Sequence, residues 1–220
     1  MSERSGASAD DPFGDRRPTS HERASGRPWD ASYLDGPAPW EVGHPQPAIV
    51  RLASQGAFTG RVLDAGCGSG DNGLHLASLG VSVLGVDVAE TALAAAREKA
   101  ADQGIEIEFA VADALHLETL GRRFDVVLDC GLFHALDGDE QAAYAAGLAT
   151  VTEPGGTVFV LCFSDQGPDT GPHPVSQADL RTAFAADGGW EIVDIEPDRV
   201  QTRFHDEAGA PAWLATIKRV

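Results

Sequence analysis

Short apolar runs alternate with amphipathic segments from about residue 61 to the end of the chain. An apolar run bounded by Gly, Pro or polar clusters predicts a strand, whereas apolar residues at helical spacing predict a helix. The predicted strands cover residues 61–66, 81–87, 105–113, 124–130, 157–164, 190–197 and 211–220. One predicted helix runs from about residue 45 to 54, and a short one follows the turn after the first strand and ends at Leu79. The other predicted helices cover residues 90–103, 139–151 and 176–186.

Strict alternation of apolar strands with helices is typical of a mainly parallel sheet that is covered by helices on both faces. The sequence therefore predicts an α/β fold. In such sheets ligands bind at the carboxyl ends of the strands, at the point where the strand order reverses. The residues that follow the first four predicted strands are therefore the first candidates for a binding site.

The first 60 residues have a different character. Residues 1–27 are rich in Ser, Gly, Pro and mixed charge and have little to bury, so this tail is expected to be disordered in isolation. An aromatic, proline-punctuated segment over 28–56 follows, and we expect it to form an N-terminal cap on a domain that spans 28–220. Whether the tail folds over a bound ligand stays open.

The first predicted strand ends in a glycine-rich turn, DAGCGSG, which runs from Asp64 to Gly70. Glycine lets the backbone turn sharply and lets a ligand approach more closely than a Cβ would permit. A dinucleotide-binding loop requires a third glycine in GxGxxG, and that position is Asp71 here. Asp64 would also repel a pyrophosphate, whereas it can anchor an ammonium group directly or through water.

Carboxylates also follow the second and third predicted strands. Asp87 lies about twenty residues beyond the first glycine, where a carboxylate can accept both ribose hydroxyls of an adenosine. Asp113 ends the third strand, where it can accept from an adenine amino group. Each acid has an alternative role as the cap of the following helix. Together with Asp64, however, the three acids surround one GxGxG turn.

The strings VLDAGCGSG, GVD, ADA, FDVVLDCGLFHAL and PGG, in this order over about residues 61–165, resemble the motif set of class I S-adenosylmethionine-dependent methyltransferases. The resemblance implies a Rossmann-like, seven-stranded, mostly parallel sheet whose last strand inserts antiparallel. It also implies S-adenosylmethionine as cofactor and S-adenosylhomocysteine as product. The cofactor contacts that it implies are Trp40, Asp64, Gly66, Cys67, Gly68, Gly70, Asp87, Val88, Asp113, Ala114, Asp129 and Cys130.

The segment WDASYLDGPAPWEVGHPQPAIVRL resembles the N-terminal stretch of small-molecule methyltransferases of the thiopurine, thiol/halide and tellurite-resistance type. In that group an aromatic segment lies over the cofactor, and the matching positions here are Trp29, Tyr33 and Trp40. Aromatic faces provide apolar contact and attract a sulfonium cation. The alternative is that these rings only fasten the N-terminal segment to the domain.

The loop after the fourth predicted strand contains the candidate catalytic residue. His134 can accept a proton from an acceptor hydroxyl, because the pKa of histidine lies near neutral pH. Alternatively, it only shapes the pocket. Asp129 is expected to stabilise this loop rather than take a proton, and Phe133 either lines the pocket or packs under the sheet. The fifth strand is followed by a loop that is either a lid over the acceptor or a surface connection. Phe163 near the end of that strand and His173 in the loop are the candidates to face the acceptor.

Charge and cysteine content narrow the function further. The chain has 16 basic and 34 acidic residues and a formal net charge of -18, which disfavours a nucleic-acid substrate. We expect neither a signal peptide nor a membrane span, because the sequence contains no apolar run of the kind that either requires. Cys67, Cys130 and Cys162 are widely spaced, so we expect neither a disulfide framework nor a metal site, and we expect a cytoplasmic protein.

The sequence thus predicts an enzyme that methylates an O, S or N atom of a small phenolic, heterocyclic or thiol acceptor. A halide/thiol methyltransferase is the alternative within this class. Less favoured are a nicotinamide-dependent oxidoreductase, a non-catalytic cofactor-binding protein and a protein methyltransferase. The sequence leaves the acceptor open, and it does not distinguish a monomer from a homodimer.

Overall fold

The computed structural model describes residues 13, 16–34, 36–167, 173–205 and 207–220. The strands are β1 (Arg61–Ala65), β2 (Ser82–Asp87), β3 (Glu108–Val111), β4 (Phe124–Cys130), β5 (Thr152–Phe163), β6 (Trp190–Val200) and β7 (Ala210–Arg219). The α-helices are α1 (Ser20–Ser25), α2 (Pro47–Ser54), α3 (Asp71–Ser78), α4 (Glu90–Gln103), α5 (Gly138–Val151) and α6 (Gln177–Ala183). Short 3₁₀ helices are η1 (Trp29–Ser32), η2 (Ala114–Leu120), η3 (Phe133–Ala135) and η4 (Ala186–Gly188).

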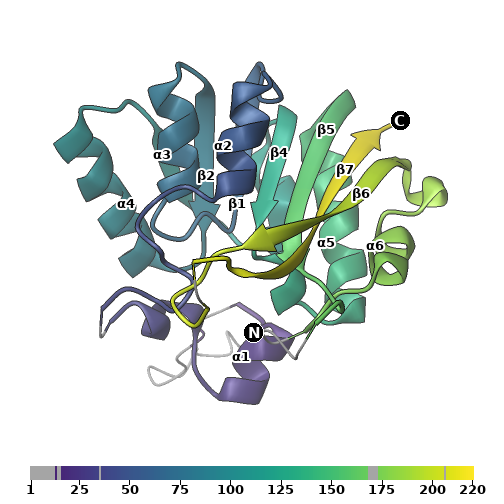
Figure 1. Ribbon diagram of the computed structural model, residues 1–220, viewed down its shortest axis with the longest axis horizontal. Coiled ribbons are helices and arrows are strands. Elements are labelled where there is room, and N and C mark those ends of the chain that lie inside the picture. The colour runs from purple at the N-terminus through teal and green to yellow at the C-terminus, as the bar shows by residue number, and fades with distance from the viewer. Residues whose placement is uncertain (1–12, 14–15, 35, 168–172, 206) are drawn as a thin grey trace, which may run out of the picture.

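The seven strands form one sheet in the order β3-β2-β1-β4-β5-β7-β6. The first five strands are parallel to their neighbours, and β7 lies antiparallel between β5 and β6. Figure 1 shows helices on both faces of this sheet. The arrangement confirms the predicted Rossmann-like fold, including the antiparallel last strand.

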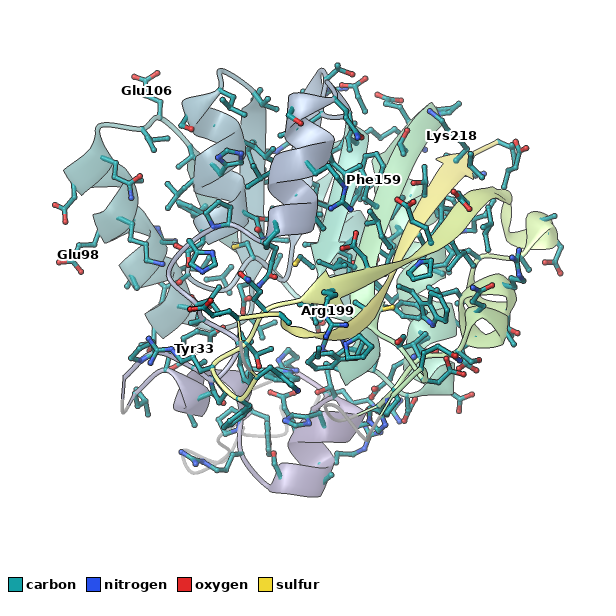
Figure 2. All side chains as sticks on the ribbon, viewed as in Figure 1. Tyr33, Glu98, Glu106, Phe159, Arg199 and Lys218 are labelled. Atoms are coloured by element: carbon teal, nitrogen blue, oxygen red, sulfur yellow. The ribbon has the colours of Figure 1, made fainter. Side chains whose placement is uncertain are left out.

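Burial on both faces explains why the central strands are apolar throughout. All residues of β1 after Arg61 are buried, because its side chains point alternately into two cores. One core packs Ile49 of α2 and Leu76 of α3 against the sheet, and Phe159 of β5 lies on this side (Figure 2). The other core packs Leu148 of α5 and Leu180 of α6 against the opposite face.

The parallel register aligns the carboxyl ends of four strands. Ala65 at the end of β1 pairs with Val86 of β2 on one side and with Asp129 of β4 on the other. On the next strand, Asp87 pairs with Val111 of β3. The loops that follow these strands therefore meet at one edge of the sheet, which is where the sequence predicts ligand contacts.

Strand lengths differ from those predicted. The strand β3 is shorter than 105–113, whereas β5 begins at Thr152 rather than at residue 157. The register shifts between Phe124, which pairs with Thr152, and Val126, which pairs with Thr157, so the Pro-Gly-Gly segment forms a bulge between these pairs. The strand β6 continues beyond residue 197 to Val200 because it pairs with β7 along its whole length, and this pairing carries it to the binding edge.

Part of the segment expected to be disordered has a defined structure. Helix α1 begins with a capping box in which Thr19 and Glu22 each bond the other's backbone N–H. The Ser20 N–H and hydroxyl donate to the Glu140 carboxylate of α5 at 2.7 and 2.6 Å. Of the expected tail over 1–27, residues 16–27 thus make polar contacts with the domain, and residues 1–12 and 14–15 lie outside the described residues. Figure 1 shows α1 below the carboxyl ends of the strands.

No helix in the described part of the chain is long and apolar enough to cross a membrane.

Candidate functional site

A cavity of about 330 Å³ lies at the carboxyl edge of the sheet. Its volume is within the range of small-molecule sites, about 300 to 1,000 Å³. Three parts of the chain enclose it: the loops after β1 to β4, the N-terminal strap (residues 16–34 and 36–46), and the end of β6 with the residues that follow it. Residues from both ends of the chain therefore complete a site that the central strands begin.

The glycine-rich turn forms the floor of this cavity. Gly66 and Gly68 have φ values of 71° and 53°, in the left-handed region that favours glycine. The N–H groups of Gly66 and Cys67 each donate to Val86 O at 2.9 Å, which ties the turn to β2. Gly66, Cys67 and Gly68, three of the expected cofactor contacts, line the cavity. Gly70 does not line it: a Cβ there would lie 2.9 Å from the Phe109 ring, so Gly70 permits close packing between α3 and β3.

Asp87 lines the cavity and at the same time holds the turn in place. One of its carboxylate oxygens accepts from Gly68 N–H and the other from Ala89 N–H, both at 2.9 Å. Burial raises the pKa of Asp87. Each oxygen keeps a lone pair for a ligand, and the next residue, Val88, also faces the cavity.

Asp113 lines the cavity from the end of β3, together with Ala114. Its carboxylate caps η2 by accepting from Leu115 N–H at 2.9 Å, and its other oxygen lies 3.2 Å from His116 Nδ1. The capping role and the ligand-facing position thus coexist in one side chain.

Two predicted contacts, Asp64 and Asp129, do not line the cavity in the described structure. Both side chains are buried behind the loops, and burial raises the pKa of each to about 7. Asp129 accepts from Leu132 and Phe133 N–H groups at 3.0 and 3.2 Å and so shapes the loop after β4. Asp64 faces Gly73 of α3. Their positions indicate support of the two loops rather than direct contact with a ligand.

The three thiols are free. Cys67 and Cys130 line the cavity, whereas Cys162 lies in the core. Burial raises the pKa of all three, so they are neutral and of low reactivity at neutral pH. No cluster of His, Cys, Asp or Glu able to hold a metal ion occurs among the residues that the structure describes.

The aromatic residues of the N-terminal strap line the cavity as predicted. Trp40 Nε1 donates to Tyr33 Oη at 2.9 Å, and the Trp40 ring meets both Tyr33 and Trp29 edge to face. The Trp29 ring stacks on His21 at a centroid distance of 4.6 Å. Figure 2 places Tyr33 below the carboxyl ends of the strands, among the side chains of the strap.

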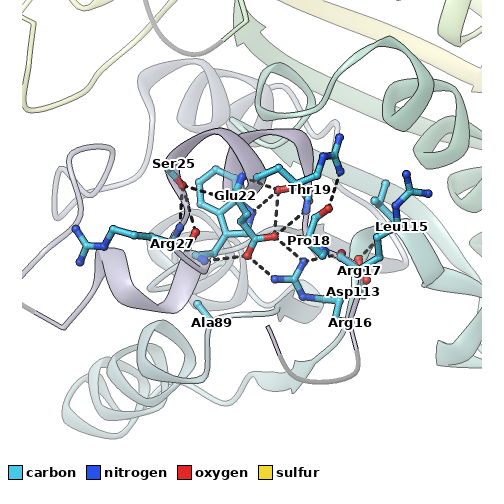
Figure 3. A network of polar contacts seen from close by, with 12 residues as sticks. Arg16, Arg17, Pro18, Thr19, Glu22, Ser25, Arg27, Ala89, Asp113 and Leu115 are labelled. Atoms are coloured by element: carbon cyan, nitrogen blue, oxygen red, sulfur yellow. Dashed lines mark hydrogen bonds and ion pairs between the residues drawn. The ribbon is translucent and has the colours of Figure 1, made fainter. Parts of the chain in front are cut away.

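Glu22 organises the beginning of the strap. It is fully buried, and its carboxylate accepts from Arg16 Nη1 at 2.7 Å, Thr19 N–H at 2.9 Å and Trp29 N–H at 3.0 Å. The dashed contacts in Figure 3 converge on this side chain. These hydrogen bonds outweigh the cost of burial and lower the pKa of Glu22. Arg16, which also lines the cavity, is thereby held near Asp87 and Asp113.

Glu41 was missed by the sequence analysis. Its carboxylate accepts from Ser69 N–H at 3.1 Å and from the Ser69 hydroxyl, so the strap is tied to the glycine-rich turn. Lys99 donates to the same hydroxyl and to Asp71, both at 2.6 Å. The only signal in the sequence is an acid directly after Trp40, and its partner is known only once the chain has folded.

His134 lines the cavity, but its surroundings contradict the predicted role as a proton acceptor. Phe163 N–H donates to Nδ1 of His134 at 3.1 Å. A neutral imidazole that accepts at Nδ1 carries its proton on Nε2, so Nε2 is a donor. Burial, with smaller contributions from His173 and His21, lowers the pKa of His134 to about 3. His134 is therefore neutral at physiological pH and able to donate a hydrogen bond, but it is a poor base.

The other side chains that were expected to contact the acceptor lie in different places. Phe163 lines the cavity and stacks on the His134 ring at 4.2 Å. Phe133 does not line it: the side chain is fully buried and stacks on Phe184 in the core, because η3 turns it under the sheet. His173 is also absent from the described cavity wall, although it lies near enough to His134 and His21 to influence their pKa values.

A group of polar residues from distant segments completes the wall and was not predicted. Its members are His21, Gln46, Asn72, Gln201, Thr202 and His205. Gln46 N–H donates to Asn72 Oδ1 at 2.9 Å, which joins the strap to α3. The residues after β6 lie outside every motif that the sequence analysis used, so no local pattern indicated them.

Comparisons with known proteins show the family to which the chain belongs. The family model described as a methyltransferase domain matches residues 62–156. A 2-heptyl-1-hydroxyquinolin-4(1H)-one methyltransferase from Mycobacteroides abscessus is 37% identical over 166 residues, covering 74% of this chain and 72% of that protein. A probable thiol methyltransferase from Arabidopsis thaliana is 29% identical over 178 residues, covering 79% of this chain and 77% of that protein.

Among solved structures, one reported for the conversion of a disulfide bond into a thioacetal group during echinomycin biosynthesis is 37% identical. It has a TM-score of 0.78 and covers 86% of this chain and 91% of its own. The ordered motifs, the strand order and these relatives agree, and the chain belongs to the S-adenosylmethionine-dependent methyltransferases.

Proposed function

We propose that this protein transfers the methyl group of S-adenosylmethionine to a hydroxyl oxygen of a flat, mainly apolar, aromatic small molecule. The observation that carries the proposal is that two kinds of group line one cavity: acidic side chains with a glycine-rich turn, and aromatic rings with a neutral histidine. Acidic groups suit a nucleoside with a positive charge, and aromatic rings suit a planar acceptor. We assign the first group to a cofactor part of the site and the second to an acceptor part.

The cofactor part fits an adenosyl group attached to a methionine. Asp87 has lone pairs for the ribose hydroxyls, and Asp113 lies at the next strand end for the adenine. Gly66 and Gly68 carry no Cβ, so the backbone can approach a ligand closely at these two positions of the turn. When bound, S-adenosylmethionine supplies a methyl group on a positively charged sulfur, and the acidic wall together with the Trp40 ring favours such a charge.

In the acceptor part, the flat aromatic wall and one hydrogen-bond donor determine which acceptor fits. The rings of Trp29, Tyr33 and Phe163 offer flat apolar contact. His134 presents Nε2–H, which can donate to an acceptor oxygen and fix its orientation. The chain thereby aligns the reactants and excludes water, which are the main requirements of an in-line methyl transfer.

A second candidate function is methyl transfer to a thiol or thiocyanate-like anion. The relative named as a thiol methyltransferase and the structure reported for a thioacetal conversion favour a sulfur acceptor. Such an acceptor is already anionic or easily ionised, so it needs no base. The weak basicity of His134 is compatible with either acceptor.

An acceptor screen separates the two functions. Purified protein would be incubated with S-adenosylmethionine and thiols, halides, phenols or hydroxyquinolines, with S-adenosylhomocysteine release and product mass as readouts. We expect methyl ethers from the hydroxylated heterocycles. Exclusive formation of methyl thioethers or methyl halides would replace the first proposal by the second. Calorimetric binding of NADH without binding of S-adenosylhomocysteine would contradict both.

The setting of the reaction is also a proposal. The net charge of -18 supports a small-molecule acceptor rather than a nucleic acid, and the free thiols support a cytoplasmic location. We further propose that residues 28–220 form the methyltransferase domain, whether as monomer or homodimer. Sedimentation of the purified chain and fractionation of cells test these statements.

A further inference from the structure

The segment between β6 and β7, described over residues 201–205 and 207–209, forms a cavity wall to which no role has yet been given. It is termed the β6–β7 loop here. Gln201, Thr202, Phe204 and His205 all line the cavity. The loop therefore stands beside the acceptor part of the site, next to Phe163.

The β6–β7 loop is fastened to the N-terminal strap. Gln201 N–H donates to Gln46 Oε1 at 2.8 Å, and Gln46 Nε2 donates to Gln201 O at 2.9 Å. Arg203 adds two further bonds, from its N–H to Pro39 O at 2.8 Å and from Nε to Glu41 O at 2.7 Å. Because the strap also lines the cavity, these bonds hold the loop in a defined position relative to the site.

Within this loop, Thr202 orients the ring of His205. The Thr202 hydroxyl lies 2.7 Å from His205 Nδ1 and accepts from Phe204 N–H at 3.2 Å. A hydroxyl oxygen has two lone pairs, so it can also accept from a proton on Nδ1. In that tautomer Nε2 of His205 carries a lone pair and is a proton acceptor.

His205 also lies between the cavity and a second recess on the outside. That recess is lined by Arg203 and Glu207 together with residues of the main cavity, among them Val42, His44 and His205. It is open to solvent. A proton taken up on the cavity side therefore has a short route to water.

His205 and His134 both have their rings near Phe163, but the surroundings of the two side chains differ. The centroid distances to Phe163 are 4.2 Å for His134 and 6.1 Å for His205. His134 is buried and its Nδ1 is occupied by a backbone N–H, which makes it a donor. His205 is only partly buried, and its Nδ1 partner is a hydroxyl that can act in either direction.

We propose that His205 is the proton acceptor for a hydroxyl acceptor and that His134 is the hydrogen-bond donor that orients it. The inference rests on the function proposed above. The acceptor O–H bond breaks, its electron pair stays on oxygen as the nucleophile, and the proton bonds to Nε2 of His205. The imidazolium then releases this proton to water in the outer recess. The charged or titratable groups around His205 are Arg203 and Glu207 of its own loop, His44 of the strap and His134 across Phe163.

The test compares two phenols of similar shape, one ionised at the assay pH and one not. His205→Gln and His205→Asn both remove the basic nitrogen, and the amide of Asn can still bond Thr202. We expect kcat for the un-ionised phenol to fall by about 10²- to 10⁴-fold, the usual contribution of a general base, and kcat for the ionised phenol to fall less than about tenfold. His134→Gln should slow both phenols by similar factors.

The pH profile gives a second readout. With the un-ionised phenol, wild-type kcat should rise with pH and level off once the base is deprotonated, whereas kcat of His205→Gln should keep rising until the phenol itself ionises. Thr202→Val should show a smaller loss with the same dependence on the acceptor. Circular dichroism and the Kd for S-adenosylhomocysteine, expected within about twofold of wild type, would establish that each variant is folded.

Equal losses on both phenols, or no loss with either His205 variant, would overturn the role of His205 while leaving the proposed function intact. If the wild-type protein makes no methyl ether from any hydroxyl acceptor but does methylate thiols, the proposed function and this inference both fall.

Discussion

The backbone N–H of Phe163 donates to Nδ1 of His134 at 3.1 Å, so the end of β5 sets the tautomer of a histidine that follows β4. The two rings also stack at 4.2 Å. One residue thus supplies both the apolar face and the polar contact that hold the imidazole neutral. This relationship changes the expected chemistry of His134 from proton acceptance to hydrogen-bond donation.

The lowered pKa of His134 predicts a specific dependence of stability on pH. The folded value is about 3, below the usual value of 6.5, so the unfolded state binds more protons between these two values. His134 therefore contributes stability that is present above about pH 6.5 and is lost progressively as the pH falls towards 3. Urea unfolding of wild type and His134→Gln at pH 7, 6 and 5 should show a shallower decline for the variant. A variant whose unfolding free energy falls as steeply as that of wild type would contradict the prediction.

The contribution of Asp129 to stability should depend on pH in the opposite direction to that of His134. Burial raises its pKa to about 7, above its usual range, so the folded state holds the proton more tightly. Its contribution to stability is present below the unfolded pKa near 4 and is lost as the pH rises through 7. Asp129→Asn keeps an oxygen for the Leu132 and Phe133 N–H groups and cannot ionise. Because this loss extends from about pH 4 to about pH 7, we expect the Tm of the Asn variant to change less than that of wild type between about pH 4.5 and 7.5.

Asp129→Ala serves as the control for the preceding prediction. It removes the acceptor for two backbone N–H groups and should destabilise the protein by about 1–3 kcal/mol at every pH. Equal behaviour of the Asn and Ala variants would indicate that the loop does not depend on this oxygen.

Gly68→Ala should weaken cofactor binding through the backbone as well as through crowding. A Cβ at Gly68 would lie 2.5 Å from Glu41 Oε1, and φ is 53°. Glu41 is a flexible side chain and can move, but the left-handed backbone costs a residue with a Cβ about 1–2 kcal/mol. We expect the Kd for S-adenosylhomocysteine to rise at least tenfold in calorimetry. Adding Glu41→Ala should recover only part of this loss, and full recovery would show that crowding alone was responsible.

Variants of Phe133 and Phe163 should separate an effect on core packing from an effect on acceptor binding. Phe133→Ala removes a fully buried ring that packs on Phe184, and it should lower the free energy of unfolding by about 3–5 kcal/mol. Phe163 has its ring against the cavity and His134, so Phe163→Leu should raise KM for the acceptor more than it lowers stability. Chemical denaturation and steady-state kinetics on both variants provide the comparison. An acceptor-specific defect in a stable Phe133→Ala would place that ring in the site instead.

Glu22 should hold the N-terminal strap in its position over the cavity. Its buried carboxylate joins Arg16, Thr19 and Trp29, and removing it leaves their donors without a charged partner. Glu22→Ala should therefore make the strap more sensitive to trypsin and raise the KM for S-adenosylmethionine several-fold, while the Tm of the main sheet changes little. Glu90→Ala, which removes an exposed ion pair with Arg97, is the control and should change neither.

The sequence by itself determined the sheet and its cofactor edge. Apolar runs such as RVLDAG and FDVVLDC can only be buried on two faces, and the alternating helices supply the cover. Glycines at positions 66 and 68 and acids at positions 87 and 113 are local consequences of a sharp turn and of strand ends. Pattern and position therefore coincide there, because a sharp turn and a strand end are each formed by residues close in the chain.

Only the tertiary structure decided which side chains face the cavity and in what chemical state. Asp64 and Asp129 resemble Asp87 in sequence, yet the packing of α3 and η3 buries them behind the loops. His134 became a donor because Phe163, from another strand, occupies its Nδ1. Glu41 and His205 entered the site through long-range contacts that no local pattern encodes. Protonation state and orientation depend on burial and on partners distant in the chain, and these exist only after folding.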